Sequence, residues 1–212
     1  MRARHKPGTR SIVIGAAALA LIVAMALDTK VVAIGSPEAA QPNVFSPDAF
    51  GAAEFPQIKA GIESRAVEAQ VLAQALTADK AAAVKQYGMP AGTGGQVFSV
   101  KFTGVAGDAK SGVYDVAVSG LLETIGIRVQ TGPAINGTDL RDATGTIKFG
   151  SFVNQIEYQN AGSALNREMK KQILEKLDTA NLKGKTISVI GAFKLINPKK
   201  WLVTPVALEV QP

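Results

Sequence analysis

The sequence predicts an α+β protein in which a short helical layer precedes a β-domain of five or six strands. Three observations lead to this class. Residues 11–27 form an uncharged apolar run, residues 46–92 carry apolar side chains at helical spacing, and from Gln96 onward apolar and polar residues alternate. Because a change of period from 3.6 to 2 separates helix from strand, we expect helices before Gln96 and mostly strands after it.

The first 28 residues are predicted to be a signal peptide or a signal-anchor transmembrane helix. Residues 1–10 carry four basic side chains, and the apolar run that follows carries no charge. By the positive-inside rule, the N-terminus stays in the cytoplasm and the C-terminal bulk enters the periplasm. A helix over residues 11–27 spans about 25 Å, which suits a short single-pass anchor in the inner membrane or a signal peptide. Retention and cleavage near Ala26 both stay open.

The composition excludes several classes of function. The net charge is +6, but four positive charges lie in residues 1–10, which leaves +2 for the rest of the chain. This near-neutral remainder argues against nucleic acid as a partner. The chain has no cysteine, and its single histidine is His5 in the leader. Catalytic triads, Cys–His pairs and metal sites built on histidine or cysteine are therefore excluded from the exported part, and we expect no metal and no cofactor.

Residues 29–45 are predicted to be an extended linker, because they hold two prolines and many small side chains. One short strand is expected within it, at residues 30–34. Ser46 and Pro47 then mark a helix start, with Ser as the N-cap and Pro in the first turn, where its missing N–H removes no hydrogen bond.

The helical segment is predicted to cover residues 46–92. Pro56 and Gly61 interrupt its apolar pattern, so we expect two or three short helices instead of one rod. Residues 88–95, with the sequence GMPAGTGG, are expected to be a flexible hinge before the strands. The predicted parts of the chain are a leader (1–28), a linker (29–45), this helical segment (46–92) and a β-domain (93–212).

Alternation predicts three strands and a shorter fourth one. Residues 98–102 and 114–118 are expected to form a β-hairpin around a turn at residues 107–112. The third strand is expected at residues 125–129, and the fourth at residues 146–152.

One amphipathic helix and two further strands close the chain. Ser163 is the predicted N-cap of the helix. Its apolar stripe consists of Leu165, Met169, Ile173 and Leu177. The two strands are expected at residues 187–195 and 202–210. Because Pro205 cannot donate a hydrogen bond to a ladder, the last strand is predicted to be an edge strand or to carry a bulge.

This order of elements matches a five-stranded OB-type barrel, in which the helix falls between the third and fourth strands. An α+β sandwich would give the same order and stays an alternative. In the barrel, the ring of Trp201 is expected to cover one end. Stacking on a ligand or a base is the second interpretation of this residue.

Polar side chains are densest in residues 131–144 and 152–166. Carboxylates, amides, an arginine and a tyrosine are groups with which a site hydrogen-bonds a polyol or another small polar ligand. The candidate ligand-binding residues are Asn136, Asp139, Arg141, Asp142, Asn154, Gln155, Glu157 and Tyr158. The structural alternative is that these residues close turns and cap helices, as Asn and Asp commonly do.

Three carboxylates in this stretch, Asp139, Asp142 and Glu157, raise the alternative of a hydrolase-type enzyme. Such an enzyme needs two carboxylates about 5–10 Å apart across an open cleft. Arg141 is a ready ion-pair partner that would keep a neighbouring carboxylate ionised. We therefore expect no catalytic residues and no enzymatic activity.

Four runs of sequence carry a resemblance to a known family. They are TKVVAIG, FSPDAFGAAEFP, TGPAINGTDLRDATGTIKFGSFVNQIEYQNAGSALN and INPKKWLVTPVALEVQ. From Thr29 to its C-terminus the chain resembles the DUF2291 proteins, described as predicted periplasmic lipoproteins of unknown function. Several members look like lipoproteins, with a lipid-modified cysteine just before the Lys-Val-Val run. This chain has Thr29 at that position, so the resemblance implies export without a lipid.

The resemblance also implies an accessory role in uptake, because relatives are often encoded near sugar ABC-transporter components. It brings no established catalytic residues. We expect a membrane-tethered, periplasmic, non-enzymatic accessory or binding module. Its expected partners are the inner membrane, through residues 11–27, and a sugar ABC-transporter component or a small polar ligand. The carboxylate-based hydrolase is the alternative function. A single-strand nucleic-acid-binding OB domain is a third one, disfavoured by the export signal and the near-neutral charge.

Overall fold

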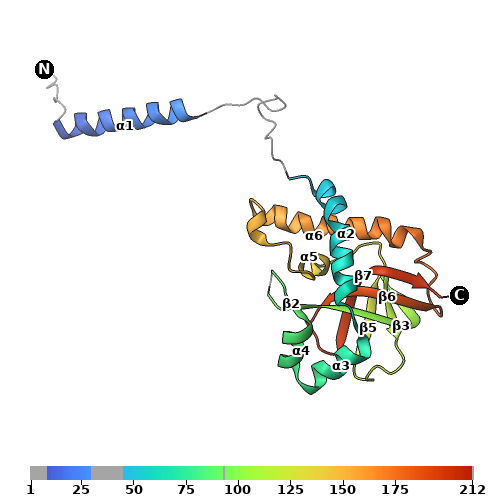
Figure 1. The fold of residues 1–212 in the computed structure, drawn as a ribbon. Helices are drawn as coiled ribbons and strands as arrows, with labels where there is room; N and C mark the ends of the chain where they lie inside the picture. Colours follow the sequence, from blue (N-terminus) through green and yellow to red (C-terminus); the bar gives the residue numbers. More distant parts are fainter. Residues whose placement is uncertain (1–8, 30–44, 93, 212) are drawn as a thin grey trace. The chain divides into compact units, whose positions relative to one another are not determined.

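The computed structural model describes residues 9–29, 45–92 and 94–211 (Figure 1). By its internal contacts the chain divides into two compact units, Met1–Val44 and Phe45–Pro212. The second unit contains both the helical segment and the β-domain, so these two predicted parts share one core.

The described part of the first unit is one helix, α1 (Thr9–Asp28), which contains the predicted apolar run. Over the described ranges, the structure contains no helix with the length and apolarity that a membrane crossing requires. The short strand expected at residues 30–34 lies outside the described residues.

The second unit begins with three helices, α2 (Pro47–Arg65), α3 (Ala69–Ala78) and α4 (Lys80–Tyr87). Ser46 is the N-cap of α2 and Pro47 lies in its first turn, as predicted. The breaks predicted at Pro56 and Gly61 are wrong, because α2 continues through both residues.

Packing holds α2 together across its internal proline. Phe55, Ile58 and Ile62 lie on one side of the helix and are at most 1% exposed. Each such buried side chain contributes about 1.5–3 kcal/mol, whereas a proline inside a helix costs about 3 kcal/mol. The burial of three side chains therefore outweighs the cost of one proline, and the helix continues through Pro56 despite the tendency of proline to break it.

The hinge predicted at residues 88–95 is also wrong. β2 (Gly88–Pro90) pairs antiparallel with β3 (Gln96–Lys110), and Gly88 lies opposite Phe98. Residues 88–90 are therefore one arm of a hairpin, held to the sheet by backbone hydrogen bonds, and the described residues after them belong to its turn.

Seven strands of the described residues form one sheet. The remaining ones are β1 (Val67–Glu68), β4 (Val113–Ala117), β5 (Gly126–Gln130), β6 (Thr186–Lys194) and β7 (Lys200–Val210). β3 pairs antiparallel with β4 and β6, β4 pairs with β5, and β6 pairs with β7, while β5 and β7 run parallel. These pairings close into a ring of five strands. The predicted α+β class and the hairpin, third and last two strands are thus confirmed.

Of the two alternatives predicted for the last strand from Pro205, an edge strand or a bulge, the structure has the irregular register, because β7 pairs with both β5 and β6. The register between β6 and β7 shifts between Ile190, which faces Ala207, and Gly191, which faces Pro205. Proline therefore lies where the ladder is already irregular, and its missing N–H costs little there. A side chain at Gly191 would collide with the carbonyl oxygen of Thr204, so glycine permits the close approach of the two strands.

The fourth strand predicted at residues 146–152 is wrong. This segment is irregular apart from one 3₁₀ turn, η1 (Phe149–Ser151). The preceding strand, β5, already pairs with β4 on one side and β7 on the other. Because an alternating segment needs a partner edge to become a strand, closure of the ring leaves these residues as a loop.

The amphipathic helix α6 (Gln155–Gln172) begins before its predicted N-cap, and Ser163 lies exposed inside it. Asn154 is the N-cap. Its side chain accepts a hydrogen bond from the Glu157 N–H at 2.9 Å, and the Glu157 carboxylate accepts one from the Val153 N–H at 3.1 Å. This reciprocal pair fixes the helix start in the manner of a capping box.

The predicted apolar stripe of α6 is confirmed at Leu165 and Met169, which are fully buried. Leu177 lies beyond the helix, after a second 3₁₀ turn, η2 (Leu174–Lys176). α6 packs against α2 (Figure 1). At this contact, a Cβ added to Gly51 would lie 2.8 Å from the backbone oxygen of Ala164.

Trp201 is part of the hydrophobic core. It is fully buried, and its indole N–H donates to the carbonyl oxygen of Pro198 at 3.0 Å. Its ring stacks on Phe193 with the centroids 4.7 Å apart. Stacking on a ligand is therefore excluded for this ring.

The close contact between α2 and α6 predicts the effect of a substitution at Gly51. Gly51→Ala is expected to lower the free energy of unfolding by about 1–3 kcal/mol, because the added methyl group must displace the α6 backbone. Gly150→Ala is the matched control, since a Cβ there meets no atom within 4 Å, and it is expected to change stability by less than about 0.5 kcal/mol. Urea unfolding followed by circular dichroism measures both; equal midpoints would contradict the close contact.

Candidate functional site

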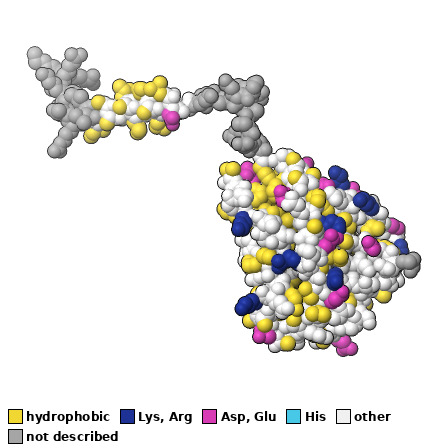
Figure 2. Space-filling view, viewed as in Figure 1, with side chains coloured by type: hydrophobic (Ala, Val, Ile, Leu, Met, Phe, Trp, Pro, Cys, Tyr) yellow, Lys and Arg dark blue, Asp and Glu magenta, His cyan; other side chains and the backbone are white. Residues whose placement is uncertain are grey.

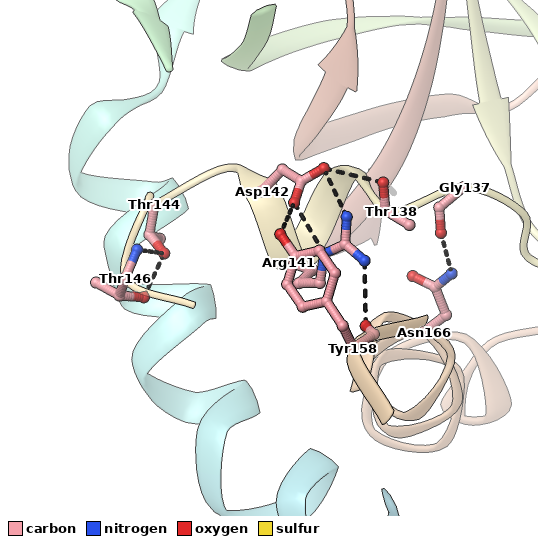
Figure 3. A network of polar contacts seen from close by, with 8 residues as sticks. All are labelled: Gly137, Thr138, Arg141, Asp142, Thr144, Thr146, Tyr158 and Asn166. Carbon is pink, nitrogen blue, oxygen red and sulfur yellow. Dashed lines mark hydrogen bonds and ion pairs between the residues drawn. The ribbon is translucent and has the colours of Figure 1, made fainter. Parts of the chain in front are cut away.

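The candidate ligand-binding stretch folds around a buried arginine. α5 (Asp139–Asp142) is a single helical turn that follows β5, and its Arg141 is fully buried. The guanidinium Nε and Nη2 donate to the two carboxylate oxygens of Asp142 at 2.8 and 3.1 Å (Figure 3). Such two-bond pairing gives strong, oriented, charge-assisted hydrogen bonds. The buried positive charge is thereby matched by the residue next to it.

Tyr158 of α6 completes the surroundings of Arg141. The guanidinium carbon lies 3.6 Å from the centroid of the tyrosine ring, which is cation–π geometry. Nη1 donates to the Tyr158 carbonyl oxygen at 3.1 Å, and the tyrosine hydroxyl donates to Oδ1 of Asp142 at 3.3 Å. Burial, and then the charge of Asp142, raise the pKa of Tyr158, so its hydroxyl keeps the proton that it donates.

The loop before α5 is fixed by two side-chain hydrogen bonds. The Thr138 hydroxyl donates to Oδ2 of Asp142 at 2.9 Å, and the Asn166 amide of α6 donates to the carbonyl oxygen of Gly137 at 2.9 Å (Figure 3). Gly137 has a φ of 96°, a conformation that favours glycine. The network therefore joins the β5–α5 loop to α6. We call Thr138, Arg141, Asp142 and Tyr158 the arginine network.

Asp139 lies beside the arginine network and is half-buried. Burial, and then the negative charge of Asp142, raise the pKa of Asp139 from 3.8 to about 7, while the backbone N–H and the charge of Lys194 act in the opposite direction. Near neutral pH this carboxyl group therefore holds its proton part of the time.

A cavity of about 320 Å³ borders the arginine network, and we call it the network cavity. Three segments that are distant in sequence meet there: the turn after β2, the loop before η1 and the first turn of α6. The residues that line it are Met89, Pro90, Gly92, Asp142, Gly145, Ile147, Lys148, Phe149 and Tyr158. Lys148 and Phe149 are exposed to solvent, whereas Asp142 and Tyr158 form its buried wall.

Two glycines determine the shape of the network cavity. A side chain at Gly92 would collide with the hydroxyl group of Tyr158. Gly145 has a φ of 70°, and a Cβ there would lie 2.7 Å from Sδ of Met89. The backbone can approach the tyrosine and the methionine this closely only because neither position carries a side chain.

The structure brings half of the candidate residues together and separates the others. The α5 ion pair and the tyrosine lie in the network, with Asp139 at its edge. Asn154 and Glu157 cap α6 instead, as the structural alternative predicted. Asn136 and Gln155 are exposed and do not border the network cavity. That the gathered residues bind a ligand stays a prediction.

Sequence reasoning missed the cavity residues Lys148 and Phe149, because their segment was interpreted as a strand. A usable signal was present. Gly145 and Gly150 flank these two residues, and such spacing of glycines is typical of a loop. Met89 was missed because its role depends on the hairpin that β2 makes with β3.

A larger cavity of about 570 Å³ lies where the β3–β4 turn meets the end of α6. Two of the polar side chains that line it have partners within the chain. The Tyr114 hydroxyl contacts the carbonyl oxygens of Thr179 and Ala180 at 3.0 and 2.9 Å, and the Lys170 amino group donates to the carbonyl oxygen of Pro133 at 3.1 Å. Over the described part of the chain, acidic and histidine side chains form no group of three or more that would hold a metal ion.

Comparison with known proteins identifies the family. The family described as "Predicted periplasmic lipoprotein (DUF2291)" matches residues 16–209. The chain belongs to the DUF2291 family. The resemblance found in the sequence is thus confirmed, and the family's description supports a location outside the cytoplasm. Because the chain has no cysteine, it departs from the lipoprotein part of that description.

A solved structure confirms the fold type of this DUF2291 protein. An OB-fold protein from Thermotoga maritima superposes with a TM-score of 0.65 at 18% sequence identity, covering 80% of this chain and 100% of that one. At this identity the likeness shows the fold alone. No curated protein gives a significant match.

The buried ion pair predicts a large effect at Arg141. Arg141→Met leaves the Asp142 carboxylate buried without its partner, and we expect the free energy of unfolding to fall by about 3–5 kcal/mol. Arg167→Met is the control, because it breaks an exposed pair with Asp48, which is worth at most about 1 kcal/mol. Urea denaturation measures the free energy of unfolding of both variants. Similar decreases in the two would contradict a large stabilising role for the buried pair.

The raised pKa of Asp139 predicts a pH-dependent stability. The folded chain binds the proton of Asp139 more tightly than the unfolded chain does. The stabilisation that this proton gives to the folded state is therefore fully present below about pH 4 and is lost as the pH rises to about 7. Asp139→Asn is expected to flatten the stability profile in this window. Urea midpoints measured across it test this, and an unchanged slope in the variant would contradict the assignment to Asp139.

Proposed function

We propose that this DUF2291 protein is a non-enzymatic, periplasmic binding module, held at the inner membrane by residues 11–27, that takes a small polar ligand in the network cavity. The observation that carries this proposal is the cavity itself, whose buried wall is formed by Asp142 and Tyr158 and is held in place by their hydrogen bonds within the arginine network. A wall of this kind is pre-organised, so a ligand would not have to order it.

The lining of the network cavity favours a ligand with several hydroxyl groups. The Lys148 amino group is a hydrogen-bond donor at its exposed side, and the Asp142 carboxylate and the Tyr158 hydroxyl lie at its inner wall. Phe149 offers a half-exposed ring, with 53% of its surface accessible, on which the apolar face of a sugar ring can pack. A volume of about 320 Å³ is at the small end of ligand sites. We therefore propose a polyol or monosaccharide.

An accessory role beside a sugar ABC transporter agrees with this ligand class. It rests on the family resemblance, and the site chemistry supports it only in favouring a polyol. In this proposal the module would hold or hand over a sugar outside the inner membrane.

The alternative function, a carboxylate-based hydrolase, finds less support in the geometry. Asp142 is bound by Arg141 through both oxygens, and Glu157 accepts a hydrogen bond from the α6 cap. Two carboxylates engaged in this way are not available as the acid and base of a glycosidase-type mechanism. We therefore keep binding as the proposed activity.

Calorimetric titration of the full chain in detergent tests the proposed ligand class. The ligands to titrate are glucose, galactose, xylose and myo-inositol. One of these is expected to give saturable heat. Lys148→Ala and Phe149→Ala are each expected to weaken that binding by about tenfold, which corresponds to about 1.4 kcal/mol. Both side chains are exposed, so the fold should be kept, whereas a substitution of Arg141 would disturb the fold first.

Lys110→Ala is the matched control, because Lys110 is exposed at the end of β3 and does not border the cavity. Its affinity should equal that of the wild type. Absence of heat with all four ligands, or equal affinities for all variants, would reject the proposed ligand class.

The proposed role of residues 11–27 in export predicts that the domain lies in the periplasm. Two arginines in the apolar run, Leu19→Arg with Ile22→Arg, are expected to stop export, because charged side chains are costly within a membrane. Protease added to spheroplasts should then degrade the wild-type domain but spare the variant. Arginines at exposed Gln159 and Asn160 of α6 serve as control and should leave the domain accessible. Equal degradation of all forms would contradict an exporting role for residues 11–27.

A further inference from the structure

Three large apolar side chains are exposed within eight residues around the start of α6. Phe149, Val153 and Ile156 are 53, 86 and 70% exposed, and we call them the apolar patch. Figure 2 shows hydrophobic side chains at the end of the domain where α2 and α6 begin. Exposed apolar side chains that gather in this way mark an interaction surface more often than single ones do.

A rigid aromatic cluster supports the apolar patch. Phe149 packs edge-on against Tyr158, and Phe152 packs against the same tyrosine, with centroids 5.5 and 5.4 Å apart. Phe152 in turn contacts Phe45 and Phe50 at 5.5 and 5.6 Å. The capping box of α6 holds Val153 in the same region. Ring packing at Phe149 and the helix cap at Val153 therefore hold two of the three patch residues in place.

The position of Phe45 shows where the chain from residues 11–27 enters the domain. Phe45 is the first described residue of the domain, and its ring contacts Phe152, so the chain from the apolar leader enters the domain beside the patch. Residues 29–44 can span at most about 55 Å when extended. A bilayer that holds the leader is thus within reach of this end of the domain.

The charge of the segment that carries the patch agrees with a lipid surface, and the exposed Asp48 near the start of α2 is paired with Arg167. Residues 148–156 contain Lys148 and no acidic side chain. The nearest carboxylate in sequence, Glu157, accepts a hydrogen bond from the Val153 N–H as part of the cap. Aromatic and aliphatic side chains next to a basic one are the composition with which peripheral segments enter the headgroup region of a membrane with anionic lipids.

We propose that the apolar patch docks on the periplasmic face of the membrane that the leader holds, with the start of α6 in contact with the lipid headgroups. This inference rests on the proposed tethering by residues 11–27. Because Phe149 belongs to both the patch and the network cavity, docking would bring the mouth of that cavity close to the bilayer.

The absence of cysteine from the sequence makes a direct test possible. Single cysteines at Val153→Cys, Ile196→Cys and Ala18→Cys, in the full chain, carry a polarity-sensitive dye. Each protein is reconstituted in vesicles of phosphatidylcholine and phosphatidylglycerol. Ile196 is the matched control, since it is an aliphatic residue 85% exposed in the β6–β7 connection. Nitroxide-labelled lipids then quench any dye that contacts lipid.

We expect a blue shift and a loss of fluorescence at positions 18 and 153, and neither at position 196. In a second protein, Ile156→Asp added to Val153→Cys should abolish the shift at 153 and leave its circular dichroism unchanged. Quenching at position 18 without quenching at 153 would overturn docking and leave the tether in place.

Two other outcomes reject the proposal in different ways. If the dye at position 18 stays in water, the tether of the proposed function fails together with docking. If the dye at position 153 is shielded without vesicles, and more so at higher protein concentration, a second copy of the chain covers the patch instead of lipid.

Discussion

The guanidinium of Arg141 is a positive charge placed where no water reaches it, and the neighbouring structure depends on satisfying it. An isolated buried charge would destabilise the domain by several kcal/mol, so each donor must meet an acceptor. Asp142 supplies both carboxylate oxygens, and Tyr158 supplies a carbonyl oxygen and a ring face. These contacts tie the turn α5 to the first part of α6 and so determine where that helix can lie.

Closure of the strand ring is the second constraint, and it decides what becomes loop. With β3, β4, β5, β7 and β6 paired in a cycle, and β1 and β2 paired with β3 outside it, the described residues between β5 and β6 add no strand to the sheet. They are left to form α5, η1, α6 and η2. The network cavity therefore arises outside the ring, mostly from loop and helix residues together with Met89 and Pro90 of β2.

The same few residues connect the two proposed activities. Tyr158 contacts Arg141 with one face of its ring and also packs against Phe149 and Phe152. One tyrosine thus stands between the buried charge and the exposed apolar patch. A ligand in the cavity and a lipid surface at the patch would both contact Phe149, which is why binding and docking need separate variants to be told apart.

The sequence by itself determined the α+β class, the helix start at Ser46, the strands of the ring and the irregularity at Pro205, because these follow from periodicity and from the chemistry of single residues. Tertiary structure decided the rest. α2 crosses Pro56 because three buried side chains outweigh it, and α6 starts at Asn154 instead of Ser163 because of the Glu157 cap and the packing of Tyr158. Of the candidate site, the sequence supplied the polar residues, but only folding decided which became caps, which formed the arginine network and which loop residues, Lys148 and Phe149, completed the cavity. Sequence patterns indicate which secondary structure a segment favours locally. Which segments become buried or pair as strands depends on contacts between parts that are far apart in the chain.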